Sequence, residues 1–147
     1  MNKYMIGIDL GGTNIKSAVF DTAFNVVEER SDPTEADKGP AHVLNKMKVI
    51  ISEMLGASGI RPESVVCMGM GIPGLLDPEI GLSIFSPNFP EWENVHVVRE
   101  MSRDFPFPIF IDNDVRVICM ASGSSALEPD TRIWFCLPLE PGSVQEL

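Results

Sequence analysis

The stretch MIGIDLGGTNIKSAVFD, residues 5–21, constrains the fold of this chain more than any other segment. Two apolar runs rich in β-branched residues lie on either side of Gly11 and Gly12, too close together for a helix to connect them. The pattern therefore predicts strands over residues 4–10 and 16–21 that pair antiparallel across a tight turn.

The next segments extend this unit with a third strand and a helix. A strand over residues 25–30 is predicted to pair antiparallel as well, and the polar run 31–38 reads as a loop. Pro40 suits the first turn of a helix running to about residue 58, which Gly59 ends. Its apolar residues recur at three- and four-residue spacing and form one stripe: Val43, Met47, Ile50, Ile51 and Met54.

The second half of the chain alternates strands with helices. The expected elements are a strand over 64–71, a Gly/Pro-rich connection over 72–93, a helix over 95–103 with Asn94 as its cap, a strand over 108–112 and a helix from Asn113 to about 120. Three antiparallel strands followed by helix-linked strands make an α/β domain with a mixed sheet.

Composition narrows the class of partners. The net charge of −10 argues against nucleic acid as the main partner, because such binding needs a basic face. No apolar run approaches the roughly 20 residues of a membrane span. The three cysteines are odd in number and contain no CxxC pair, which disfavours a disulfide framework. We expect a cytoplasmic protein.

The glycine turn is a candidate phosphate site. Adjacent glycines let backbone N–H groups converge without Cβ obstruction, and such nests bind phosphate. Thr13 adds a hydroxyl, and Asp9 ends the preceding strand with a carboxylate that needs donors or a cation, such as a hydrated Mg²⁺. For Gly-Gly alone, a hairpin turn with no ligand would be the simpler interpretation.

The residues DLGGTNIK resemble the first phosphate motif of the actin/hexokinase/Hsp70 ATPase superfamily, and with Lys16 they are similar to the ROK family of sugar kinases and repressors. The segment is not a Walker A loop, since Ile15 precedes Lys16. The resemblance implies a ribonuclease H-like fold and binding of ATP with Mg²⁺. Phosphate would be bound by the turn residues and Lys16, with Asp9 organising Mg²⁺ through water; the turn residues are Gly11, Gly12 and Thr13.

The sequence GMGIPG, residues 69–74, matches G-x-G-x-x-G, but a dinucleotide site would need a helix to open there. Pro73, Gly74 and Pro78 exclude one, so we reject that interpretation. Residues 71–74 resemble instead the G-x-P-G loop that lies against the sugar in the ROK family, which would place Gly74 at the sugar. From the residues alone, a turn that merely ends the strand is an equal alternative.

The loop SPNFPEW, residues 86–92, resembles the Asn…Trp segment that follows in the family. Asn88 offers both a donor and an acceptor, as a sugar hydroxyl requires. Trp92 is interpreted as a loop anchor. His42 and His96 match no family site and are expected to be solvated or structural.

Asp112-Asn113-Asp114 follows the last predicted strand and opens a helix. The family motif ends in Asn-Asp, so the resemblance gives Asp114 the role of the catalytic base that accepts the sugar hydroxyl proton, and makes Asn113 and Asp114 sugar ligands. Phosphoryl transfer needs such a carboxylate beside good alignment. Both residue types are also common helix caps. The bulkier residues that follow, Val115 to Val117, depart from the family pattern.

The resemblance covers residues 4 to about 120, and the domain prediction is a lobe over residues 1–120 followed by a non-native or disordered tail over 121–147. The family's second phosphate motif, its Glu-x-Gly-His segment and its zinc site do not occur in that tail. Reading the last base of each codon with the first two of the next permits Gly-Thr-Gly-Val-Gly-Ser-Gly-Ile across residues 139–147. The hypothesis is a frameshift near residues 120–122.

The sequence thus predicts the N-terminal lobe of an ATP-dependent kinase for a hexose or N-acetylhexosamine, with little activity in this chain. The full-length family implies a homodimer. The alternatives are a sugar-sensing ROK regulator, disfavoured because no DNA-binding segment precedes the phosphate motif, and a non-catalytic fragment.

Overall fold

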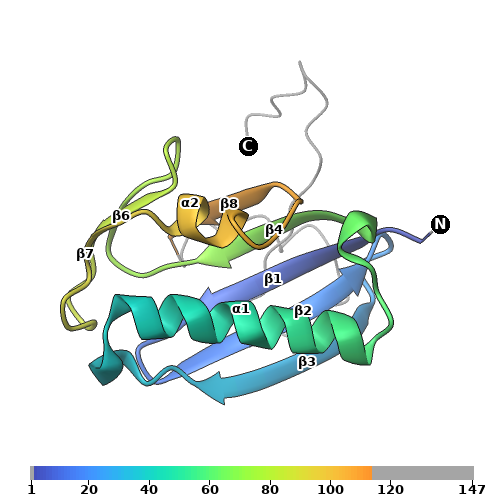
Figure 1. Cartoon of the computed structure of the whole chain (residues 1–147), viewed down its shortest axis with the longest axis horizontal. Helices are drawn as coiled ribbons and strands as arrows, with labels where there is room; N and C mark the ends of the chain where they lie inside the picture. Colours follow the sequence, from blue (N-terminus) through green and yellow to red (C-terminus); the bar gives the residue numbers. More distant parts are fainter. Residues whose placement is uncertain (1, 114–147) are drawn as a thin grey trace.

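A five-stranded mixed sheet forms the centre of the computed structural model, which describes residues 2–113. Its strand order is β3-β2-β1-β4-β8. The strands are β1 (Tyr4–Leu10), β2 (Asn14–Asp21), β3 (Val26–Pro33), β4 (Val65–Gly71) and β8 (Ile109–Asp112). Figure 1 shows them side by side, with the amino-terminal strands on one half of the sheet.

Strand direction follows the length of each connection. Short turns join β1, β2 and β3, and both pairs are antiparallel, as predicted. Strand β4 returns beside β1 in parallel after a helix, and β8 pairs in parallel with β4. The third strand runs three residues further than predicted, to Pro33, and the remainder of the expected polar loop contains a 3₁₀ turn, η1 (Ala36–Lys38).

Two helices cover one face of the sheet. The long helix α1 (Pro40–Ala57) begins at Pro40 as predicted and crosses β1, β2 and β3, and the short helix α2 (Val97–Ser102) lies nearer β8 (Figure 1). The whole predicted apolar stripe of α1 is buried against the sheet. The 3₁₀ turn η2 (Pro62–Ser64) leads into β4. Within the described part of the chain, no helix is long and apolar enough to cross a membrane.

The Gly/Pro-rich connection is more ordered than the sequence indicated. It carries a second, three-stranded antiparallel sheet made of β5 (Leu75–Asp77), β6 (Leu82–Phe85) and β7 (Glu93–Val95). Asn94 was therefore wrongly predicted as a helix cap: it lies inside β7 with φ of 50°, and α2 begins later, after His96. The indole N–H of the buried Trp92 donates to Ser83 Oγ at 2.8 Å, which ties the end of this segment to β6.

Candidate active site at the carboxyl edge of the sheet

Three parallel strands end at the same edge of the main sheet. In the register, Asp9 at the end of β1 pairs with Gly71 of β4, and Gly71 pairs with Asp112 of β8. Lys16 of β2 lies opposite Asp9 on the other side. Side chains at paired positions project from the same face of a sheet. Two carboxylates and an ammonium group therefore line one row at the carboxyl edge, where open α/β sheets commonly bind ligands.

The glycine turn continues from this row. The Gly11 N–H donates to the Asn14 carbonyl at 3.0 Å and closes the turn between β1 and β2. A Cβ at Gly11 would lie 2.7 Å from that same carbonyl oxygen, which is too close. Glycine is thus required at position 11 because the backbone approaches closely there. A left-handed conformation is not the reason, since neither Gly11 nor Gly12 has a positive φ.

The opposite side of the turn is fastened by Thr34, which the sequence interpretation missed. Thr34 is fully buried, and its hydroxyl donates to the Gly11 carbonyl at 2.6 Å while its N–H donates to the Thr13 carbonyl at 2.9 Å. It follows β3 directly, and the predicted loop over 31–38 concealed it. A buried threonine in a polar segment leaves no periodic signal, so only the pairing of β3 with β2 places it here.

Gly12 brings the predicted phosphate turn against the predicted sugar loop. Its α-carbon faces the loop over residues 86–92, and a Cβ built on Gly12 would lie 3.8 Å from the Asn88 Cβ. Asn88 itself is exposed. Phe89 and Trp92 hold this loop from inside, because both are buried and their rings lie 5.2 Å apart. Trp92 is therefore the loop anchor that was predicted.

Gly74 and Asn113, two of the predicted sugar ligands, contact each other. Gly74 has φ of 100°, and a Cβ there would lie 2.2 Å from the Phe85 carbonyl oxygen. The Asn113 side-chain amide donates to the Gly74 carbonyl at 3.0 Å, so this loop is attached to the end of β8. The Asn113 N–H donates to the Asp112 carboxylate at 2.8 Å. Asp114, the predicted catalytic base, and the helix predicted to contain it lie outside the described residues.

Charged groups next to Thr34 make a separate cluster on η1 and α1. The Glu35 carboxylate lies 2.8 Å from Lys38 Nζ, 3.0 Å from His42 Nε2 and 2.7 Å from Lys46 Nζ. Hydrogen bonds from Lys38, then Lys46 and His42, hold the pKa of Glu35 well below its ordinary value. His42 thus has a structural contact, in line with the sequence prediction.

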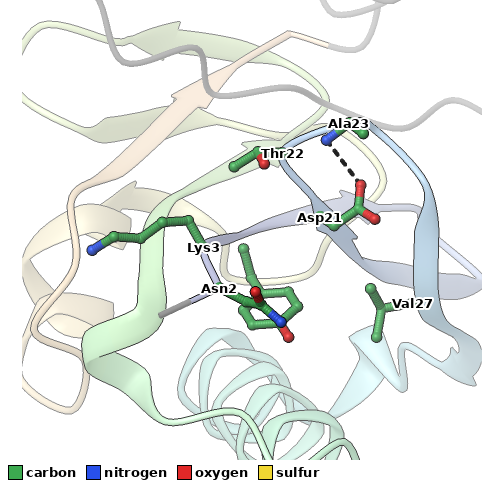
Figure 2. Close-up of a pocket in the computed structure, with 7 residues that line it drawn as sticks. Asn2, Lys3, Asp21, Thr22, Ala23 and Val27 are labelled. Atoms are coloured by element: carbon green, nitrogen blue, oxygen red, sulfur yellow. Dashed lines mark hydrogen bonds between the residues drawn. The ribbon is translucent and has the colours of Figure 1, made fainter.

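A cavity lies at the opposite end of β1. It measures about 440 Å³ and lies at the amino end of this strand, against the β2–β3 turn, where Figure 2 shows Asn2, Lys3, Thr22 and Val27 along its walls. Its carboxylate, Asp21, accepts hydrogen bonds from the Ala23 and Asn25 N–H groups at 2.9 Å. These bonds lower the pKa of Asp21, the Asn25 side-chain bond most of all. The Asp21 carboxylate therefore stabilises the β2–β3 turn.

The carboxyl edge suits phosphate and a magnesium ion better than a protein-caged metal. Among residues 2–113, no group of three or more His, Cys, Asp or Glu could hold a metal ion. A hydrated Mg²⁺ needs only one or two protein carboxylates beside phosphate oxygens. Asp9, half-buried next to the exposed turn, fits that requirement.

Comparison with known sequences places these motifs in a family. The ROK family profile matches residues 5–141. A glucokinase of Thermotoga maritima is 28% identical over 116 residues, 79% of this chain and 35% of the relative. A putative xylose repressor of Caldicellulosiruptor sp. is 26% identical over 110 residues, 75% of this chain and 27% of the relative. The chain thus spans about a third of the length of these relatives.

Solved structures share the fold. A ROK hexokinase from Thermus thermophilus superposes with a TM-score of 0.70 and 27% identity, over 81% of this chain and 38% of the other. A ROK family glucokinase from Streptomyces griseus, determined with glucose and AMPPNP, gives a TM-score of 0.68 and 20% identity over 79% and 35%. The fold is therefore the actin-like ATPase fold that the sequence predicted. With its family profile, strand order and glycine turn in agreement, this chain belongs to the ROK family.

Proposed function

We propose that this chain is the N-terminal lobe of an ATP-dependent sugar kinase that transfers a phosphoryl group to a hydroxyl of a hexose or N-acetylhexosamine. The observation that carries the proposal is the proximity of Gly12 to Asn88: a Cβ built on Gly12 would lie 3.8 Å from the Asn88 Cβ. This proximity supports the proposal, because transfer between a nucleotide and a sugar requires a phosphate-binding turn beside a sugar-binding loop.

On the nucleotide side, the turn would supply backbone N–H groups and the Thr13 hydroxyl. Lys16 is exposed one strand away and would neutralise phosphate charge. Asp9 would orient water molecules on Mg²⁺, which accompanies ATP and balances charge on its phosphates.

On the sugar side, Asn88 and Asn113 would hydrogen-bond sugar hydroxyls, while Gly74 would keep its loop close to the sugar. The Asn113–Gly74 bond supports this role, because it already joins two of the three groups. Asp114, which follows Asn113 directly, would accept the proton of the attacking hydroxyl.

The complete enzyme would be a cytoplasmic homodimer whose second lobe closes over the substrates and completes the nucleotide site. Since the chain spans about a third of its relatives, we expect it to bind ligands weakly and to phosphorylate sugar very slowly or not at all.

The test is a residue-resolved NMR titration of the chain with MgATP, glucose and N-acetylglucosamine in turn. MgATP should shift the amides of Gly12 and Thr13, and a sugar should shift those of Asn88 and Asn113. Shifts confined to the cavity around Asn2 and Thr22 would refute the proposal.

Two variants sharpen this experiment. Asn88→Ala should abolish the sugar-dependent shifts, whereas Asn45→Ala, at another exposed asparagine on α1, should leave them intact. In the present chain, Asp114→Asn should retain sugar binding. In a protein to which a complete second lobe has been restored, the sugar should be phosphorylated when residue 114 is Asp and not when it is Asn.

A sugar-sensing regulator is the second candidate, because a putative xylose repressor is among the relatives. Such a protein would bind sugar without needing MgATP. Sugar-dependent shifts with no response of Gly12 or Thr13 to MgATP would favour this function over the kinase.

For the tail, we propose that residues 121–147 arise from a frameshift near residues 120–122. The permitted glycine-rich reading across residues 139–147 supports this proposal, whereas the match of the family profile as far as residue 141 in the present frame opposes it. The nucleotide sequence of the gene tests it: the shifted frame must encode that glycine motif, and any other reading there disproves the frameshift.

A further inference from the structure

Thr34 is a buried residue that holds the inner side of the glycine turn. Its two donors each reach a different carbonyl of the turn: the hydroxyl meets Gly11 O at 2.6 Å, and the backbone N–H meets Thr13 O at 2.9 Å. The side chain is wholly enclosed, whereas Gly12 and Thr13 are exposed. The turn therefore has a fixed inner side and an open outer side.

These two hydrogen bonds also fix the direction of the N–H group in each of the two peptides whose carbonyls they hold. In a planar trans peptide, the C=O and the following N–H point to opposite sides of the bond, and no described peptide bond is cis. Drawing the Gly11 carbonyl inward to Thr34 turns the Gly12 N–H outward. In the same way, the bond to the Thr13 carbonyl turns the Asn14 N–H away from Thr34.

The outward Gly12 N–H is available to a ligand. Within the described residues, no hydrogen bond from this N–H is found. An anion needs such N–H groups directed toward it and carbonyl oxygens directed away, because a carbonyl dipole repels negative charge. Thr34 meets both conditions at once by occupying two carbonyls.

We propose that Thr34 is a positioning residue for anion binding: its hydroxyl fixes the Gly11–Gly12 peptide so that the Gly12 N–H faces the phosphate. This inference rests on the proposed function for the identity of the ligand, but the direction of the N–H is a property of the ligand-free chain. Thr34 does not itself contact the anion.

The test compares Thr34→Val, which is nearly isosteric and lacks the hydroxyl, with Thr34→Ser, which retains it. Residual dipolar couplings in ligand-free protein report the orientation of the Gly12 N–H, and titration with magnesium tripolyphosphate reports anion affinity. Thr34→Val should reorient the Gly12 N–H, so that this group no longer donates to the anion. Losing that one hydrogen bond should weaken the affinity about tenfold. Thr34→Ser should restore both values to near wild type.

Thr22→Val is the matched control, since Thr22 is exposed and follows the end of β2 that lies away from the glycine turn. It should change neither measurement. If Thr34→Val does not fold, Thr34→Ala provides a second hydroxyl-free variant, and unfolding of both would assign Thr34 to fold stability and overturn the inference.

The two proposals fail in different ways. Wild-type protein that never binds tripolyphosphate would contradict the proposed function, while the dipolar couplings would still decide the role of Thr34. An unchanged Gly12 N–H orientation in Thr34→Val, or equal affinities in Thr34→Val and wild type, would overturn the inference about Thr34.

Discussion

Asp9 and Lys16 lie directly opposite each other on β1 and β2, one residue before β1 ends and the glycine turn begins. Their side chains project from the same face of the sheet, so a carboxylate and an ammonium group border the turn together. In the proposed site, this pairing would offer the magnesium ion a carboxylate and the phosphate an ammonium group.

Removing the Asp9 charge should therefore remove the response to magnesium. Wild-type protein is expected to bind tripolyphosphate more tightly with Mg²⁺ than without it, because the ion links the carboxylate to the phosphates through water. Asp9→Asn should bind with the same affinity in both conditions, as measured by isothermal titration calorimetry. Asp37→Asn, an exposed carboxylate on η1, is the control and should respond like wild type. A magnesium response that survives in Asp9→Asn would exclude Asp9 from the ion site.

The two glycines of the turn should tolerate alanine differently. At Gly11 the new Cβ meets the Asn14 carbonyl oxygen at 2.7 Å, so the turn must shift, and we expect a loss of about 1–3 kcal/mol in unfolding free energy. At Gly12 the nearest atom, Asn88 Cβ, is 3.8 Å away, so the fold should be unaffected. Urea unfolding of both variants checks this, and equal stabilities would contradict the structure of the turn.

Gly12→Ala should instead affect ligand binding, because Gly12 faces the loop that carries Asn88. A methyl group there projects into the space between the two loops, and we expect Gly12→Ala to weaken tripolyphosphate binding while the free energy of unfolding stays at the wild-type value. Unchanged affinity in a folded Gly12→Ala protein would show that the ligand lies elsewhere.

Gly74→Ala and Gly56→Ala form a second contrasting pair. Gly74 combines φ of 100° with a Cβ position 2.2 Å from the Phe85 carbonyl oxygen, so alanine should cost more than about 2 kcal/mol in unfolding free energy and loosen the bond from Asn113. Gly56 is exposed in α1, and a Cβ built on it would meet no neighbouring atom within 4 Å outside the adjacent helix backbone. Alanine there should therefore raise the free energy of unfolding by roughly 0.5–1 kcal/mol. Thermal and urea unfolding would measure the loss of stability in Gly74→Ala and the gain in Gly56→Ala. An unfolding free energy of Gly74→Ala equal to that of wild type would disprove the close approach of Gly74 to the Phe85 carbonyl.

The main sheet could be predicted from sequence because its signals are local. Short connections force β1, β2 and β3 to pair antiparallel, and the apolar stripe of α1 recurs with the period of a helix. The small sheet was not predicted, because β5 and β7 have three residues each and lie among glycines and prolines. Asn94 then resembled a cap, since an asparagine before an apolar run commonly begins a helix.

The site was predictable only as separate motifs. The residues of the turn and of the Asn88 loop could be named from their types, but the proximity of Gly12 to Asn88 is long-range and involves a loop between two strands of the second sheet. Thr34 shows the limit most clearly. A threonine hydroxyl can bond many partners, and its choice of Gly11 O is set by the register of β3 on β2, which no local pattern specifies.

The Glu35 cluster gives a pH dependence with a defined sign. Lys38, Lys46 and His42 lower the pKa of Glu35 in the folded chain, so the folded state releases this proton more readily than the unfolded state. The stabilisation is therefore present above the ordinary glutamate pKa of 4.5 and is lost as the pH falls below it. We expect wild type to unfold at a higher urea concentration than Glu35→Gln at pH 7, with the difference shrinking toward pH 3. Because the cluster is partly exposed, 1 M NaCl should also reduce the difference at pH 7. A difference that is constant from pH 7 to pH 3 would show that Glu35 acts through packing rather than charge.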